Sequence, residues 1–366
     1  MTNGHRRRTR RLPVALAVAA LAATLSALPA PAGAAAPSVA PSPVRTAPGP
    51  LSGPLAKLAT AATGDRSRAA LNSLAGLPAA GPGSLLRQAD GRLLVDVWVT
   101  SPAALAAAEA GPSTSLVALG PDGRTATLAV PSTGLAALAA TPGLRSAREI
   151  PEPSVAPESS TSPAATTRVA TCPTGVVSEG DAQLHAALAR THGGVNGSGI
   201  KVGIISDSYA KFASEASADV AAGELPGSAN PCGFTKPVKV LSDYHASDAT
   251  DEGRAMAQIV HDLAPGAQLL FASGFNGDID FADQILALRD AGATVIVDDL
   301  GYFNETSYQD GPIAAAVDQV TADGVAYFSA AGNDQFTLAG KSVGSYEASH
   351  FRPASCPAAL GAGYTG

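Results

Sequence analysis

The sequence predicts an α/β fold, with a parallel β-sheet covered by helices on both faces and a smaller α+β unit before it. From residue 178 onward, short apolar runs alternate with segments whose apolar residues recur at helical spacing. The apolar runs show no regular polar alternation, which is typical of strands buried on both faces of a parallel sheet. Residues 85–150 follow a different order, in which a hairpin lies between two helices.

The part from 178 to 366 alternates strands with helices. Met256, Val260 and Leu263 recur on one face of the segment Glu252–Leu263, which predicts an amphipathic helix. A serine at the first position favours another helix over Ser178–Arg190. The expected strands are Lys201–Ile205, Val238–Leu241, Gln268–Ala272, Thr294–Val297 and Val325–Ser329, and the remaining helices are Asp280–Ala291 and Ile313–Ala322.

The smaller unit, residues 85–150, has turn and cap signals at its element boundaries. Ser101 can cap a helix, and the turn Pro121-Asp122-Gly123 stands between two strand-like runs and predicts a hairpin. The expected order is strand Leu93–Thr100, helix Ser101–Ala110, strands Ser115–Gly120 and Thr125–Pro131, helix Ser132–Ala140 and strand Leu144–Ile150.

The N-terminus has the pattern of a secretory signal peptide over residues 1–34. Five arginines between Arg6 and Arg11 precede the apolar run Val14–Leu28, and Ala32-Gly33-Ala34 supplies small residues for cleavage. We therefore expect a secreted, extracellular protein with no membrane contact after cleavage. The Ala- and Pro-rich residues 35–84 and the Pro/Ser/Thr-rich residues 151–177 are predicted to be linkers.

Charge and cysteine content limit the partners. From Ala170 to the end there are 23 Asp and Glu against 9 Lys and Arg, so a nucleic-acid surface is not expected. Export permits disulfides, and we expect one bridge among Cys172, Cys232 and Cys356, with Cys232–Cys356 as the preferred pair. The cysteine spacing shows no C-x-x-C pair, so metal binding is not expected. No cofactor is predicted either.

Three polar residues stand at the ends of predicted strands or at the start of a predicted helix, and these positions would bring them to one edge of the sheet. Asp207 ends the first strand, Glu252 opens a helix and Asn333 stands in the small-residue turn after the last strand. Each has an ordinary structural explanation: a turn aspartate, a carboxylate at a helix N-terminus, and a turn asparagine. Together, at the carboxyl ends of parallel strands, they indicate an enzyme.

The stretches around these residues resemble the subtilisin-like serine peptidases, a group that includes the sedolisins. The family's aspartate strand is similar to the stretch KVGIISDS, which begins at Lys201. Its histidine helix is similar to EGRAMAQIVHDLAPGAQL, which begins at Glu252. Its oxyanion-asparagine loop is similar to FSAAGND, which begins at Phe328. VIVDDLG from Val295 is similar to the strand whose end lines the substrate groove. The resemblance implies a polypeptide substrate and a groove lined by Asp299, Leu300 and Gly301. It also makes residues 85–150 similar to a propeptide that acts as an intramolecular inhibitor. Structural calcium is common in the group, but no ligand set is evident.

The chain departs from the family pattern at the base. Where the family has His-Gly, this sequence has Glu252-Gly253, and His261 lies nine residues on, about 14 Å along a helix. His261 is therefore expected to be an ordinary, partly buried helix residue, and His245 is a reserve candidate. Sedolisins use a glutamate base with an aspartate one turn later, a position occupied here by Met256. The expected arrangement is a Glu252 base beside Asp207, titrating together as a dyad.

The nucleophile motif G-T-S-x-A is absent, so we expect a fragment that cannot by itself form an acyl-enzyme. The alternative function is an inactive relative that acts as a secreted binding or scaffold module. A further alternative is a metal-dependent hydrolase that uses Asp207, Asp251 and Glu252. A nucleotide site is not expected, because Val195–Gly199 precedes its strand, whereas a phosphate loop follows one.

Overall fold

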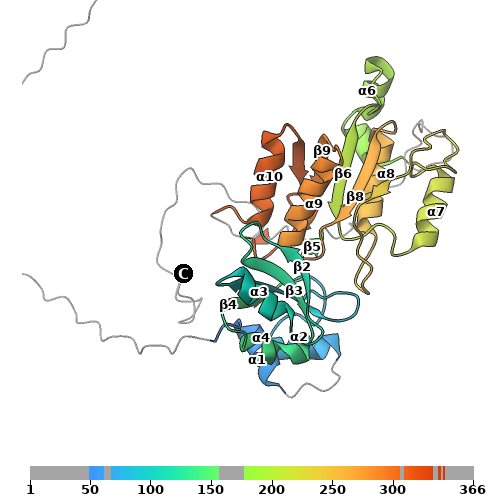
Figure 1. Ribbon diagram of the computed structural model, residues 1–366. Coiled ribbons are helices and arrows are strands. Elements are labelled where there is room, and N and C mark those ends of the chain that lie inside the picture. The colour runs from blue at the N-terminus through green and yellow to red at the C-terminus, as the bar shows by residue number, and fades with distance from the viewer. Residues whose placement is uncertain are drawn as a thin grey trace, which may run out of the picture. The chain divides into compact units, whose positions relative to one another are not determined.

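The computed structural model describes residues 49–61, 67–155, 177–305 and 309–332, together with the backbone of two short strands at 337–338 and 341–342 (Figure 1). The predicted signal peptide, residues 1–34, lies outside the described part of the chain. Within that part, no helix combines the length and apolar character that crossing a membrane requires.

The central element is a five-stranded sheet in which every described pairing is parallel. Its order is β11-β9-β6-β8-β7, so the first strand in the chain, β6, lies in the middle. Gly203 of β6 pairs with Leu270 on one side and Ile296 on the other. The strands are β6 (Lys201–Ser206), β7 (Lys239–Val240), β8 (Gln268–Ser273), β9 (Val295–Asp298) and β11 (Ala326–Ser329). The predicted parallel sheet is confirmed.

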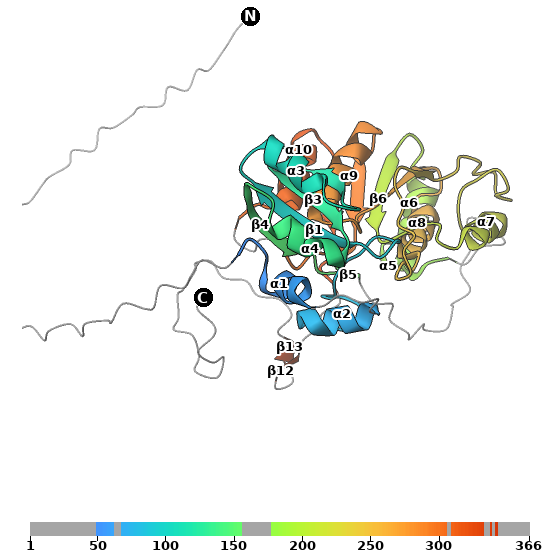
Figure 2. The same ribbon diagram turned by 60° about the horizontal axis from the view of Figure 1, so that its bottom comes forward.

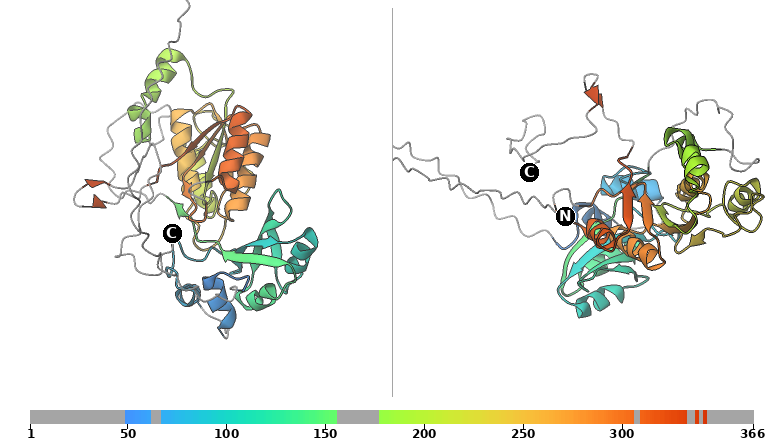
Figure 3. Two further views of the ribbon diagram at one scale, coloured as in Figure 1. Left: turned by 90° about the vertical axis from the view of Figure 1, so that its left-hand side faces the viewer. Right: turned by 90° about the horizontal axis from the view of Figure 1, so that it is seen from above.

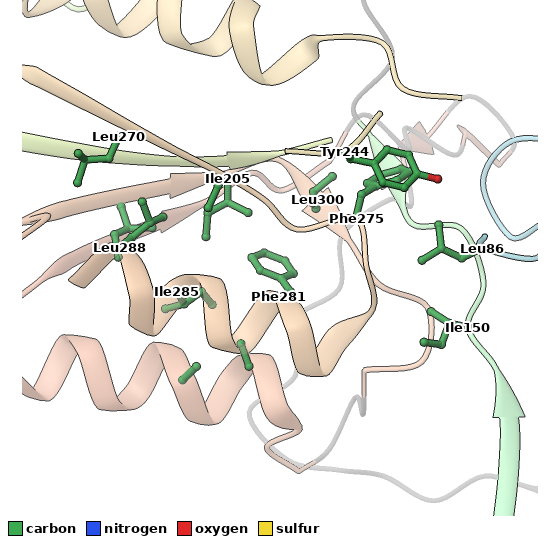
Figure 4. Packing of buried hydrophobic residues seen from close by; sticks show 14 of the residues in the cluster. Leu86, Ile150, Ile205, Tyr244, Leu270, Phe275, Phe281, Ile285, Leu288 and Leu300 are labelled. Atoms are coloured by element: carbon green, nitrogen blue, oxygen red, sulfur yellow. The ribbon is translucent and has the colours of Figure 1, made fainter. Parts of the chain in front are cut away.

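Helices cover both faces of this sheet, as predicted. On one face, Ile205, Leu270 and Ile296 pack against α9 (Asp278–Asp290) and α10 (Pro312–Ala322), as Figure 4 shows for Ile205, Leu270 and Leu288. In Figure 3 these orange and red helices lie together on one side of the strands. On the other face, residues of β6 and β8 pack against α7 (Ala213–Ala222) and α8 (Glu252–Leu263). The alternation of buried apolar residues between the two faces explains the apolar strand sequences.

Before the parallel sheet comes a four-stranded antiparallel sheet of order β2-β3-β1-β4. Its strands are β1 (Leu93–Val99), β2 (Ser115–Leu119), β3 (Thr125–Val130) and β4 (Leu144–Glu149). Its helices are α3 (Pro102–Glu109) and α4 (Leu135–Ala139), the latter preceded by a short 3₁₀ turn. Ser101 caps α3 by accepting the Ala104 N–H at 3.2 Å, as predicted. The element order predicted for residues 85–150 is present.

The predicted linker over residues 35–84 is wrong where the structure describes it. Helices α1 (Gly53–Thr60) and α2 (Arg68–Ala75) lie against one another, and α1 also contacts α4 (Figure 2). Ser52 and Ser67 accept N–H groups as helix caps. The leucines at positions 55, 58 and 71 are buried in the core of the antiparallel sheet. The prediction of a linker relied on the Ala/Pro-rich composition and did not take account of the capping serines or the leucine spacing.

The helix predicted over Ser178–Arg190 is broken in the structure. It forms α5 (Glu179–Gln183) and α6 (Ala186–Gly193), because His185 adopts a left-handed conformation with φ +55°. Ser178 does not cap with its side chain; instead its N–H donates to the Asp262 carboxylate at 2.7 Å. Helix α7 was not predicted from the sequence.

One short pairing joins the two sheets. β5 (Ser154–Val155) lies antiparallel to β10 (Leu300–Gly301), with Ser154 opposite Gly301 and Val155 opposite Leu300. The segment leading to it is held on the antiparallel side, where Pro151 bridges to Leu85. Residues 151–155 were predicted to be linker, and the structure corrects this: Pro151 bridges to Leu85, and Ser154–Val155 form a strand along the Leu300–Gly301 edge.

Candidate functional site

Asp207 lies at the carboxyl end of β6, where it holds the start of α8. Its carboxylate accepts the Ser208 N–H at 2.5 Å, the Glu252 N–H at 3.0 Å, and both the N–H (2.5 Å) and the hydroxyl (2.7 Å) of Thr250. The residue is 1% exposed. The four donors fix the position of the carboxylate at the N-terminus of α8.

Asp251 precedes α8 in a left-handed conformation with φ +63°, which an aspartate tolerates better than most residues. Its carboxylate accepts from Lys211 N, Phe212 N, the Ser208 hydroxyl and the Arg254 guanidinium, at 2.5 to 3.1 Å. Burial acts to raise the pKa of Asp251, but the two N–H groups and Arg254 outweigh it, and the pKa is lowered. Both oxygens are therefore engaged by donors.

Glu252 is the first residue of α8 and is half-buried. It lines a cavity of about 500 Å³ together with Asp207, Thr250 and Phe275. The opposite wall comes from the antiparallel side, through Pro82, Glu152 and Pro153. The structure thus brings the predicted base and the predicted aspartate to one cavity.

Arg254 is a site residue that the sequence analysis missed. It is 8% exposed and contacts Asp251 at 2.5 Å, Glu215 at 2.8 Å and Asp219 at 2.9 Å, so it fastens α7 to the first turn of α8. The signal was present, since Asp251 and Arg254 stand three residues apart, a spacing at which helical ion pairs form. Because Asp251 is fully engaged by this arginine and by backbone donors, it is not available as a metal ligand.

The metal-dependent hydrolase considered above finds no site in the described ranges. Within them, no group of three or more His, Cys, Asp or Glu side chains is placed to hold a metal ion. Asp207 and Asp251, two of the three ligands that this alternative requires, accept hydrogen bonds from N–H and hydroxyl groups instead.

Asp299, Leu300 and Gly301 follow β9 directly and lie along the pairing with β5. Burial raises the pKa of Asp299 to about 6, and the charges of Asp298 and Asp207 act in the same direction. Leu300 is buried, whereas Gly301 is exposed. Leu300 and Gly301 are paired antiparallel with Val155 and Ser154 along this edge.

The two histidines weighed as bases lie elsewhere. His261 is 3% exposed on α8, where its ring packs edge-on against Phe234 with centroids 5.1 Å apart. Burial lowers the pKa of His261 to about 4, so the ring is neutral at physiological pH. His245 lies beside Asp243 at 3.8 Å, in a separate hollow lined by Gln88 and Asn276. His261 is a helix residue as expected, but it is fully rather than partly buried.

Replacing His261 with phenylalanine is expected to flatten the loss of stability in acid. The unfolded histidine binds a proton near pH 6.5 and the folded one only near pH 4, so stability falls as the pH drops through this window. The wild-type chain should lose about 3 kcal/mol there through this residue. Urea unfolding of the wild type and the variant at pH 7 and pH 4.5 gives the stability that each chain loses in acid. Burial raises the pKa of Asp262 to about 6, which has the opposite effect on stability. Because Asp262 is present in both chains, its contribution cancels when the two losses are subtracted. An equal acid loss in both chains would contradict the assignment.

Three predicted residues lie outside the described part of the chain: the oxyanion donor Asn333 and the cysteines Cys172 and Cys356. The neighbouring Gly332 is described, with φ +80°. Cys232 is disulfide-bonded, in keeping with the expected single bridge. Its predicted partner, Cys356, stays a prediction.

Comparison with known proteins gives remote structural likeness alone. No family model and no curated protein matches the chain. Among solved structures, it is similar to fervidolysin from Fervidobacterium pennivorans, a keratinolytic enzyme related to subtilisin, with 16% identity, 71% of this chain and 43% of that one covered, and a TM-score of 0.36. It is also similar to the epidermin leader peptide processing serine protease EpiP from Staphylococcus aureus, with 13% identity, 66% and 60% coverage, and a TM-score of 0.34. The chain spans less than two thirds of either structure, and likeness at this level does not assign it to a family.

Proposed function

We propose that this chain belongs to a secreted serine-type endopeptidase of the subtilisin or sedolisin type, in which Glu252 is the general base. The proposal rests on one observation. Asp207 and Glu252 line the same cavity, and the segment that contains Glu152 and Pro153 lines it too. Glu152 and Pro153 form the opposite wall, and the next two residues pair with β10. Antiparallel addition of an extended strand to an open edge is how many proteins bind peptides.

The pairing of β5 with β10 also supports the proposal that the preceding unit acts as an intramolecular inhibitor. Ser154 and Val155 occupy the Leu300–Gly301 edge, so a polypeptide substrate that used this edge would have to displace them. Glu152 is held on the antiparallel side, where its carboxylate accepts the Ser84 hydroxyl at 2.9 Å and its N–H donates to the Ser84 carbonyl. The segment is thus anchored at one end and lies along the groove at the other.

In the proposed mechanism, Glu252 takes the proton of a serine hydroxyl during attack on the peptide carbonyl, and Asn333 donates to the developing oxyanion. A carboxylate is a weak base at neutrality, so the reaction favours acidic pH. Asp207 has a positioning role in addition to the predicted role of dyad partner. Because it accepts four hydrogen bonds, including the Glu252 N–H, it positions the start of α8.

We assign the nucleophile to neither Ser208 nor Ser273, two serines beside Asp207 whose hydroxyls are engaged. The Ser208 hydroxyl donates to Asp251 at 3.1 Å, and the Ser273 hydroxyl donates to the Asp207 carbonyl at 2.5 Å. Both hydroxyls therefore hold the carboxyl edge of the sheet together and do not point a free oxygen at Glu252.

Replacing Glu252 with glutamine tests the proposal in the secreted protein. Loss of a general base is expected to lower the rate of hydrolysis of an unstructured polypeptide by about 10²–10⁴-fold. The matched control is Asp318→Asn, which removes an exposed carboxylate from α10 and should leave the rate unchanged. The wild-type rate should be highest below neutral pH. Full activity of the glutamine variant, or an alkaline optimum, rules out Glu252 as the base.

A binding or scaffold module is the alternative function, and the occupied β10 edge is the observation that favours it. The same assay separates the two. If the secreted wild-type protein retains an extended peptide but mass spectrometry finds no cleaved product at any pH, the groove binds without catalysis. Hydrolysis that depends on Glu252 decides for the peptidase.

A further inference from the structure

Arg68 of α2 contacts the loop that leads from β7 into α8. One terminal nitrogen of its guanidinium donates to the Ser247 hydroxyl at 2.8 Å, and the other donates to the Asp248 carboxylate at 2.7 Å. A planar guanidinium presents its N–H groups as a fork, so it can meet two acceptors at once. Ser247 and Asp248 therefore form a two-acceptor site for an arginine side chain, and Arg68 occupies this site in the structure.

The Ser247–Asp248 site opens on the cavity that contains Glu252. Asp248 lines this cavity together with Asp207 and Glu252, opposite the point where Glu152 enters from the antiparallel side. Half of the residues that line the cavity are Asp or Glu, and none of these lining residues is Lys or Arg. A cavity of this composition favours a cationic side chain in whatever enters it.

Asp248 differs from Asp207 and Asp251 in the origin of its partners. Asp207 accepts its hydrogen bonds from residues around β6 and the start of α8, and Asp251 pairs with Arg254 of α8. The ion-pair partner of Asp248 is Arg68, which belongs to the antiparallel unit. Displacement of that unit therefore removes the cation from Asp248 and leaves Asp207 and Asp251 engaged.

The loop that carries the site is fixed from the parallel-sheet side. Lys211, which follows β6, donates through Nζ to the Ser247 carbonyl at 2.8 Å and to the Ala249 carbonyl at 2.6 Å. These two acceptors are backbone groups on either side of Asp248. The backbone of the site is thus held by a residue that does not depend on the antiparallel unit.

Tyr244 holds the side chain of Asp248 in the same way. Its ring packs against Phe275 with centroids 5.2 Å apart, and Figure 4 shows both residues beside the parallel sheet. The Tyr244 hydroxyl lies 2.8 Å from the Arg87 carbonyl and 3.0 Å from the Asp248 carboxylate. Since a hydroxyl has one hydrogen, it can be donated fully to Asp248 once Arg87 has been displaced.

We propose that the Ser247–Asp248 site binds an arginine side chain of the polypeptide substrate, and that Arg68 stands in for this side chain while the antiparallel unit is docked. The assignment rests on the proposed peptidase function, and it names the substrates as polypeptides with an arginine near the cleaved bond. Arginine is favoured over lysine because two separate acceptors match a fork of N–H donors, whereas an ammonium is a point charge.

Chemical rescue of Arg68→Ala in the intact chain tests the site. The substitution empties the site, and N-acetyl-arginine methylamide can then supply the missing guanidinium. At saturating concentration this probe should raise the unfolding midpoint of Arg68→Ala by about 2–4 °C. The citrulline analogue has the same shape without the charge and should leave the midpoint unchanged. The wild type, whose site is filled, should respond to neither probe.

Two double variants identify the carboxylate. Arg68→Ala/Asp248→Asn removes the acceptor and should abolish the rescue. Arg68→Ala/Asp318→Asn is the matched control, because it removes an exposed carboxylate of α10, and it should be rescued in full. An arginine probe that does not raise the midpoint of Arg68→Ala, an equal rise with both probes, or a rise that persists in Arg68→Ala/Asp248→Asn overturns the site.

The cleavage pattern of the secreted protein tests the substrate preference and separates this inference from the proposed function. Wild type and Asp248→Asn are given an unstructured polypeptide with arginine and citrulline at equivalent positions, and mass spectrometry locates the cleaved bonds. The wild type should cleave near arginine about tenfold faster than near citrulline, and Asp248→Asn should cleave at equal rates. Hydrolysis by the wild type without this preference overturns the inference and leaves the peptidase. Rescue of Arg68→Ala without any hydrolysis keeps the arginine site and overturns the peptidase.

Discussion

Replacing Asp207 with asparagine is expected to cost about 3 kcal/mol of unfolding free energy, whether or not the chain is catalytic. The wild-type carboxylate accepts four hydrogen bonds and offers no donor. An asparagine amide must turn its NH₂ group either toward Thr250 or toward the N–H groups of Ser208 and Glu252. Either orientation opposes donors in a site that is 1% exposed, and it also removes the charge that faces the N-terminus of α8.

Urea unfolding at pH 7 measures this cost. Asp318→Asn is again the matched control, because its carboxylate is exposed and surface substitutions usually stay within about 0.5 kcal/mol. A decrease below about 1 kcal/mol for Asp207→Asn would show that water can replace the carboxylate. Asp207 would then be open to a direct chemical role, and its positioning role would have to be abandoned.

Periodic features were predictable from the sequence. The helix Glu252–Leu263 has the predicted bounds because its apolar stripe and acidic first residue specify where it packs and where it begins. The meeting of Asp207 with Glu252 was predictable too, since the carboxyl ends of parallel strands share one edge. Both inferences use local pattern together with one rule about sheets.

Features that depend on a distant partner were not predictable. β5 is two residues long and is a strand because Leu300 and Gly301 lie beside it, so composition made it look like linker. The break at His185 and the left-handed Asp251 are single backbone conformations, stabilised by contacts that the sequence does not reveal. Asp251 is held in this way by Arg254 and by the N–H groups of two residues about 40 positions earlier.

The acidic composition acquires a physical explanation from these contacts. Asp207, Asp251 and Asp243 each accept backbone N–H groups from loops at the carboxyl edge of the sheet. In this region carboxylates replace the regular hydrogen bonds that irregular segments lack, since buried N–H groups require acceptors. The excess of Asp and Glu after Ala170 is thus partly structural, and a count of acidic residues alone would overstate how many serve chemistry.

Replacing Gly253 with alanine is expected to lower the unfolding free energy by about 3 kcal/mol, the reverse of the usual effect in a helix. Alanine normally stabilises a helix position by roughly 1 kcal/mol over glycine. Here its Cβ would lie 2.2 Å from the Phe271 ring and 2.7 Å from the Ser208 carbonyl oxygen. Phe271 is fully buried and packs on Tyr209, so it has no free space into which to move.

The matched control for Gly253→Ala is Gly180→Ala, since Gly180 lies in α5 and a Cβ there would meet no atom closer than 3.8 Å. This control should be neutral or slightly stabilising, and urea unfolding of the two variants at pH 7 compares them directly. The contrast would show that the glycine after Glu252 is required for close packing of α8 on β8 and the Ser208 turn. If Gly253→Ala proves as stable as the wild type, α8 can move far enough to accommodate the added Cβ. The position of Glu252 would then not be fixed by this packing.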